Sequence, residues 1–216
     1  MEEINNNIGV LFDLDGVIID SETRYTVFWE DMEAKYPSGI PNFTTKIKGT
    51  NLSSIMSHYT DENKKAAILK ELTEFEKTMR YDIFPEAQRF LDDLRAARIP
   101  CVIVTSSGQS KMDRLFAQHP ELKDYFSGIV TGEMVSHSKP HPECFIKGAE
   151  MIDVPASRCV VFEDSIYGVN AGIASGAKVV ALTTTFPDEI KKTEADRIID
   201  SFADFRISDL HSLLDD

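Results

Sequence analysis

Short apolar runs alternate with amphipathic segments along most of this chain. Four runs, at residues 8–14, 101–105, 159–163 and 178–182, are almost uniformly apolar and rich in β-branched residues, and residues 128–131 form a weaker fifth. Such runs are typical of parallel strands that are buried on both faces. Apolar residues at helical spacing predict helices at 86–98, 142–152 and 165–175. The alternation predicts an α/β fold with a parallel sheet and right-handed crossovers.

Residues 21–84 interrupt the alternation, because their patterns are helical only. They predict helices at 24–36, 52–59 and 61–80. The last is the clearest: Asp61 suits an N-cap, and Ile68, Leu69, Leu72, Phe75 and Met79 recur at helical spacing. We therefore predict a core domain of residues 1–20 and 85–216 and a small all-helical domain, residues 21–84, inserted after the first strand. The alternative is a set of extra helices packed rigidly on the sheet.

The composition narrows the class of partner. The 216 residues carry a net charge of −13, and 42% are hydrophobic, which indicates a folded, soluble protein. The negative charge argues against nucleic acid or an anionic membrane as partner. The start of the chain lacks the pattern of a signal peptide, and the three cysteines lack metal-ligand spacing. We expect a cytoplasmic monomer, which can still bind a small anion through a lysine, backbone amides and a metal ion.

Polar residues follow the carboxyl ends of the predicted strands. The first strand ends in Asp13, Leu14, Asp15 and Gly16, the second ends in Thr105, and a later one ends in Glu163 and Asp164. Lys139 lies in a Lys-Pro-His-Pro segment between strands. Because the carboxyl ends of parallel strands converge on one edge of a sheet, these groups can meet there.

The chemistry of these groups suits phosphoryl transfer. Asp13 and Asp164 can share a divalent cation, and a few carboxylate ligands suit Mg²⁺. The ammonium of Lys139 and the hydroxyl of Thr105 can neutralise phosphoryl oxygens. Asp13 can attack phosphorus to form an aspartyl-phosphate, and Asp15 can act as general acid and base. Taken singly, each motif is weak, since such residues more often cap helices or lie in solvated turns.

Taken together, the four motifs resemble the haloacid dehalogenase superfamily, and within it the β-phosphoglucomutase-like branch. The resemblance covers nearly the whole chain and implies a Rossmann-like core with a helical cap. It implies Asp13 as nucleophile and Asp15 as general acid/base. It implies Mg²⁺ held by the Asp13 carboxylate, the Asp15 backbone carbonyl and Asp164. It also implies that Thr105, Ser106 and Lys139 hold the phosphoryl group, and that Glu163 orients Lys139 or the water around the metal.

The departures from the branch favour a phosphatase over a mutase. β-Phosphoglucomutases carry a histidine where this chain has Tyr25, and a cap arginine where it has Leu52. A leucine cannot bind the second phosphate of a bisphosphate. We expect hydrolysis of small phosphorylated metabolites, with sugar phosphates as the first candidate substrates. The alternatives are a sugar phosphate mutase, an inorganic pyrophosphatase and a phosphoglycolate phosphatase. The residues expected to select the leaving group are Tyr25, Lys48, Gly49, Thr50 and Asn51.

A receiver-like phospho-acceptor domain is the non-enzymatic alternative. It would also use carboxylates, a hydroxyl and a lysine around Mg²⁺, but it would be shorter and lack the helical insertion.

His137 and His141 have a metal-like spacing, yet two prolines prevent a helix there. We therefore expect that segment to be a surface loop and not a metal site.

Overall fold

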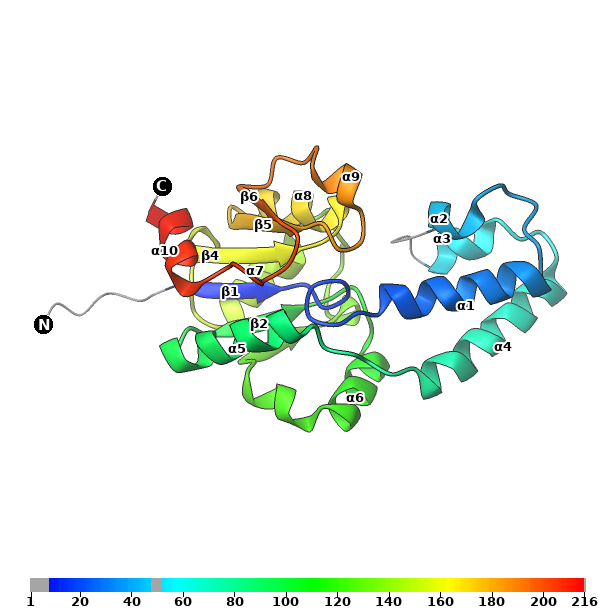
Figure 1. The fold of residues 1–216 in the computed structure, drawn as a ribbon, viewed down its shortest axis with the longest axis horizontal. Coiled ribbons are helices and arrows are strands. Elements are labelled where there is room, and N and C mark those ends of the chain that lie inside the picture. The colour runs from blue at the N-terminus through cyan, green and yellow to red at the C-terminus, as the bar shows by residue number, and fades with distance from the viewer. Residues whose placement is uncertain (1–7, 48–51, 216) are drawn as a thin grey trace, which may run out of the picture. The chain divides into compact units, whose positions relative to one another are not determined.

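The structure, a computed structural model, describes residues 8–47 and 52–215. Its centre is a six-stranded parallel sheet in the order β3-β2-β1-β4-β5-β6 (Figure 1). The strands are β1 (Gly9–Phe12), β2 (Cys101–Val104), β3 (Gly128–Val130), β4 (Cys159–Glu163), β5 (Lys178–Leu182) and β6 (Arg197–Ile199). This is the strand order of a doubly wound Rossmann-like sheet, so the predicted fold class is confirmed.

Helices cover both faces of the sheet. They are α5 (Pro85–Ala97), α6 (Gln109–Gln118), α7 (Glu143–Met151), α8 (Ile166–Ala174), α9 (Pro187–Ile190) and α10 (Ile207–Asp215), with 3₁₀ turns at Pro120–Asp124, Gly132–Met134 and Ala156–Arg158. On one face, Leu11 and Val161 pack with Phe145 of α7 and Val169 of α8. On the other, Phe12 and Phe162 stack on each other and contact Phe90 of α5. The alternation of side chains along each strand produces these two cores.

The strand register brings the predicted polar residues to one edge. Phe12 of β1 pairs with Ile103 of β2 and with Phe162 of β4. Asp13 is therefore level with the last residue of β2 on one side and with Glu163 on the other. The Asp13 N–H donates to the Phe162 carbonyl at 2.9 Å, which fixes the backbone there.

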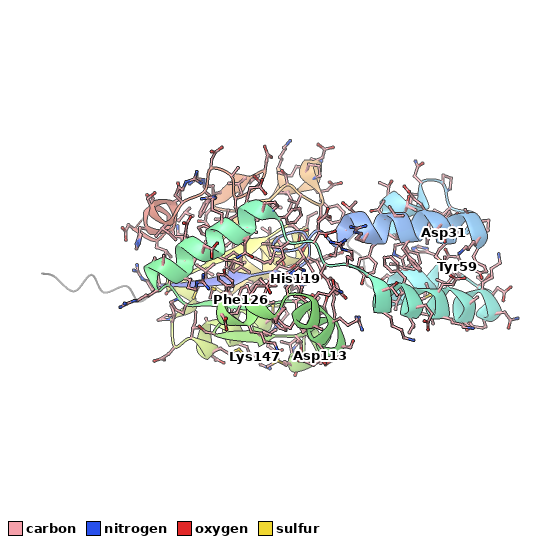
Figure 2. The ribbon with its side chains drawn as sticks, turned by 60° about the horizontal axis from the view of Figure 1, so that its bottom comes forward. Asp31, Tyr59, Asp113, His119, Phe126 and Lys147 are labelled. Atoms are coloured by element: carbon pink, nitrogen blue, oxygen red, sulfur yellow. The ribbon has the colours of Figure 1, made fainter. Side chains whose placement is uncertain are left out.

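By backbone contacts the chain divides into two compact units, Asp20–Asp82 and the remainder. The first contains α1 (Glu22–Lys35), α2 (Phe43–Ile47), α3 (Leu52–Ser57) and α4 (Glu62–Thr78). Its own core joins Phe28, Trp29 and Met32 of α1 to Ile68 and Leu72 of α4. Tyr59 is buried in the same core and is labelled in Figure 2.

The start of α4 follows the predicted pattern. The Asp61 side chain accepts the N–H groups of Asn63 and Lys64, so it is the N-cap. Leu69, which we placed on the apolar stripe, is instead 38% exposed, because the buried stripe runs through Ile68 and Leu72.

Cys101, Cys144 and Cys159 are all buried and free of disulfides. Within the described ranges, no helix combines the length and the apolar character needed to cross a membrane.

Candidate active site

The centre of the candidate site is an ammonium group held between two carboxylates. Lys139 Nζ lies 2.5 Å from Oδ1 of Asp13 and 2.7 Å from Oε1 of Glu163. It also donates to the Val104 carbonyl at 3.1 Å. These three acceptors match the three N–H donors of an ammonium, so Lys139 is held in one place. The structure thus brings together Asp13, Lys139 and Glu163 from segments far apart in the sequence.

Glu163 also organises the turn that follows β4. Its second oxygen, Oε2, accepts the N–H groups of Asp164 and Ser165, each at 2.9 Å, and the Ser165 hydroxyl at 3.0 Å. Ser165 in turn caps α8 by accepting the Gly168 N–H. Glu163 is therefore a buried, fully bonded carboxylate and not a solvated charge at a strand end.

Asp164 lies directly against the loop that follows β1. A Cβ added at Gly16 would fall 1.9 Å from Oδ2 of Asp164, and Gly16 has a φ of +74°. Only glycine combines this left-handed conformation with so close an approach. The Thr185 hydroxyl donates to the same Asp164 oxygen. The loop after β1 and the turn after β4 therefore form one packed unit around the Asp164 carboxylate.

Asp15 is held by two groups from the segment that follows β2. Lys111 Nζ of α6 lies 2.5 Å from Oδ1 of Asp15, and the Ser107 hydroxyl donates to Oδ2 at 3.1 Å. The Lys111 side chain is only 9% exposed, which is uncommon for a lysine outside an ion pair. Both side-chain oxygens of Asp15 thus have a partner within the core unit.

Thr105 and Ser106 occupy the end of β2. Thr105 is buried, and its hydroxyl accepts the Ser107 N–H at 3.0 Å. Ser106 is exposed. The structure therefore places both at the edge of the sheet where Asp13 and Lys139 lie.

Negative charge exceeds positive charge in this cluster. The carboxylates of Asp13, Asp15, Glu163 and Asp164 are accompanied by the ammonium groups of Lys111 and Lys139. Burial, opposed by Lys139 and reinforced by the neighbouring carboxylates, raises the pKa of Asp13 to about 7. Burial alone would lower the pKa of Lys139, but Asp13 and Glu163 outweigh it and raise that pKa.

This excess of buried negative charge fits a divalent cation. The available donors are carboxylate and carbonyl oxygens, the hard ligands that Mg²⁺ prefers. A cation among them would offset the burial and the carboxylate repulsion that together raise the pKa of Asp13. The residues present thus fit the Mg²⁺ site implied by the sequence.

The comparisons with known proteins agree with this geometry. Residues 9–176 match the family model of haloacid dehalogenase-like hydrolases. The chain belongs to this family. The predicted family and the prediction of an enzyme of the phosphatase kind are confirmed.

Two curated relatives and one solved structure illustrate the match. A protein of Drosophila melanogaster described as a probable pseudouridine-5′-phosphatase is 30% identical over 91% of this chain and 90% of its own length. Hexitol phosphatase A of Escherichia coli is 29% identical over 93% of this chain and 94% of its own. A hydrolase of the same family from Entamoeba histolytica has a TM-score of 0.81 at 22% identity, covering 97% of this chain and all of that one. That structure supports the fold.

The residues predicted to select the leaving group belong to the helical unit. The Tyr25 hydroxyl donates to Glu76 at 3.1 Å, and its ring packs edge-on against Phe75. Residues 48–51, which include Lys48, Gly49, Thr50 and Asn51, lie outside the described residues. Leu52, at the start of α3, is 41% exposed.

Sequence reasoning missed three contacts of the site: those of Ser107, Lys111 and Thr185. Ser107 and Thr185 each lie in a run of hydroxyl residues that follows a predicted strand, the same signal that pointed to Thr105. Lys111 interrupts the buried stripe of α6 next to Met112 and Leu115, and a charge on such a stripe is a signal of a buried ion pair.

Proposed function

We propose that this protein is a Mg²⁺-dependent phosphomonoester hydrolase that acts on small phosphorylated metabolites. Sugar phosphates are the first candidate substrates. The observation that carries the proposal is the buried Asp13–Lys139–Glu163 cluster with Asp15 and Asp164 beside it. Lys139 and the hydroxyl-rich end of β2 suit a phosphoryl group. The two curated relatives are named for phosphate esters of a nucleoside and of hexitols, which supports this substrate class.

Asp13 is the proposed nucleophile. One of its oxygens attacks phosphorus, so that a P–O bond to Asp13 forms while the bond to the leaving oxygen breaks. Asp15 gives its proton to that leaving oxygen. In the second step water attacks phosphorus, the bond to Asp13 breaks, and Asp15 takes the proton from the water. Lys139, held by Glu163 and the Val104 carbonyl, keeps its positive charge beside Asp13 and so beside the phosphoryl oxygens in both steps.

The proposed ligands of Mg²⁺ are the Asp13 carboxylate, the Asp15 backbone carbonyl and the Asp164 carboxylate. When bound, Mg²⁺ supplies positive charge that stabilises the charge developing on the phosphoryl oxygens. Asp164 would be kept in place by Thr185 and by its close packing on Gly16. Glu163 keeps Lys139 in position and leaves the metal to the other carboxylates.

The helical unit, residues 20–82, is the proposed cap that selects the leaving group. The proposal rests on its separate core and on its insertion after the loop that carries Asp13 and Asp15. Tyr25 on α1 and residues 48–51 are the proposed selecting residues.

Steady release of inorganic phosphate tests the proposal. A panel of phosphorylated metabolites is assayed with Mg²⁺ for wild type, Asp13→Asn, Asp15→Ala and the exposed control Asp188→Asn. We expect turnover by wild type and Asp188→Asn, none by Asp13→Asn, and a strongly reduced rate or an accumulated phosphoprotein for Asp15→Ala. Near-native activity of Asp13→Asn would refute the assignment of Asp13 as the nucleophile.

A further inference from the structure

The loop before α7 brings two imidazole rings together on the surface. The ring centroids of His137 and His141 are 4.5 Å apart, with their planes inclined by 32°. A turn in which the His141 N–H donates to the Ser138 carbonyl at 3.0 Å makes this possible without a helix. The segment is a loop, as predicted, and its turn brings the two rings together.

Glu143, the first residue of α7, fixes the orientation of one of these rings. Its Oε2 accepts the His137 N–H at 3.0 Å and contacts His137 Nδ1 at 3.1 Å. Its Oε1 accepts the Ser136 N–H and pairs with Lys147, which Figure 2 labels. The Ser136 amide, the His137 amide and the Lys147 ammonium all point their donors at this carboxylate, so it serves as an acceptor.

This contact decides which nitrogen of His137 is available. Because an ionised carboxylate can only accept, His137 Nδ1 must donate its proton, and the lone pair of the neutral ring is on Nε2. A carboxylate that accepts from one ring nitrogen is the arrangement that orients histidine ligands in metal sites. His141 contributes an accepting Nδ1, which takes only a long 3.3 Å bond from the Glu143 N–H.

The separations between the possible ligand atoms allow the two imidazoles to bind one ion with Glu143 beside them. One ligand atom each of His137, His141 and Glu143 can be chosen so that all lie within 4.8 Å of one another. A tetrahedral ion with bonds of 2.0–2.1 Å needs separations of about 3.3 Å. The His141 ring is exposed and held only by its long bond from the Glu143 N–H, so it can close this gap by side-chain rotation. Both rings also line an open pocket of about 610 Å³, through which a hydrated ion can reach them.

We propose that His137 and His141, with Glu143 orienting the His137 ring, form a binding site for a borderline transition-metal cation, with Zn²⁺ as the first candidate. Imidazole ligands select such ions, whereas Mg²⁺ prefers the all-oxygen donors around Asp13 and Asp164. The site is distinct from that cluster, although Lys139 lies on the same loop, between the two histidines. A bound ion would tie together the two flanks of the segment that presents Lys139.

Calorimetric titration with Zn²⁺ in excess Mg²⁺ tests the site. The proteins are wild type, His137→Ala, His141→Ala, Asp164→Asn and a control, His211→Ala, which alters a histidine on α10. We expect one Zn²⁺ per wild-type chain, at least tenfold weaker binding after loss of either loop histidine, and unchanged binding in the other two variants. Equal affinity of wild type and His137→Ala, or no binding by wild type, would overturn the proposal.

A second measurement locates the ion without reference to activity. Paramagnetic Ni²⁺ is added to ¹⁵N-labelled protein in excess Mg²⁺, and the loss of amide signals is followed. We expect residues 136–143 to broaden first. Earlier broadening around Asp13 and Asp164 would show that the metal enters the catalytic cluster instead, and the proposed site would be wrong.

Discussion

Lys111 Nζ and Oδ1 of Asp15 lie 2.5 Å apart, although the two residues are 96 positions apart in the chain. With Ser107 on the other oxygen, this contact fixes the carboxylate of the proposed general acid/base from the side of α6. Proton transfer requires the acid within hydrogen-bond reach of the leaving oxygen, so the placement of Asp15 controls the rate of the chemical step.

Replacing Lys111 tests that role. Lys111→Met should lower kcat by about 10- to 100-fold while KM changes little, because the substrate still binds but the acid is misplaced. Lys111→Arg should restore part of kcat, and the exposed control Lys192→Met should match wild type. The measurement is steady-state phosphate release. An unchanged kcat in Lys111→Met would show that Asp15 needs no support from α6.

Mg²⁺ should stabilise the protein against heat. A ligand that binds only the folded state at 100 times its Kd adds about 2.7 kcal/mol. We expect Tm of wild type and of Asp188→Asn to rise with Mg²⁺, and Tm of Asp164→Asn to rise much less. Thermal unfolding followed by circular dichroism measures this. Equal Tm shifts in wild type and Asp164→Asn would show that Asp164 is not a ligand of the metal.

Hydrolysis should exceed mutase activity. Leu52, which stands where β-phosphoglucomutases are expected to carry an arginine, has an exposed apolar side chain that cannot pair with a phosphate. With β-glucose 1-phosphate and a trace of bisphosphate activator, free phosphate should appear faster than glucose 6-phosphate. Leu52→Arg is the matched variant, and it should shift the ratio toward glucose 6-phosphate. The opposite ratio in wild type would identify a mutase.

The aromatic core should dominate the stability of the core unit. Phe90 is fully buried. Its ring stacks on Phe202 with a centroid separation of 5.1 Å and contacts Phe12 edge-on with a centroid separation of 6.2 Å. Phe90→Ala should lower the free energy of unfolding by about 3–5 kcal/mol. The control Tyr167→Ala removes an aromatic ring that is 59% exposed, and it should have little effect. Urea unfolding measures both, and similar losses would contradict the assignment of the core.

The cysteines should resist thiol reagents. Burial raises the pKa of Cys101 and of Cys159 to about 12, and it also raises that of Cys144. Reaction needs the thiolate, so labelling at pH 8 should be slow in the native protein and complete for all three thiols in denaturant. A disulfide reagent followed by absorbance measures this. Fast labelling of one thiol in the native state would show an accessible cysteine.

The strands and the contacts at their ends were predictable because the sheet register fixes them. Uniformly apolar runs identified β1, β2, β4 and β5, and the residue after each run necessarily lies at one edge. Asp13 and Glu163 therefore meet whatever the details of the helices. The strand β6 was missed, since its three residues are only partly buried and carry no clear pattern.

Contacts that depend on side-chain reach were not predictable. Lys111 reaches Asp15 only because α6 starts at Gln109 and turns this position inward. Similarly, the separation of the His137 and His141 rings depends on the turn at Ser138. Spacing along the chain does not specify such rotamers and turn geometries.

The ends of the helical insertion lie next to each other. The Asp20 N–H donates to the Asp82 carbonyl at 2.8 Å, and Ile19 forms an antiparallel bridge with Ile83. The chain therefore leaves the Rossmann-like core at Ile19 and returns to it at Ile83, directly alongside, as the two strands of a hairpin do. An exchange of everything between these two points demands no new strand pairing, so evolution can replace the inserted helical unit while the sheet that carries Asp13 is inherited unchanged.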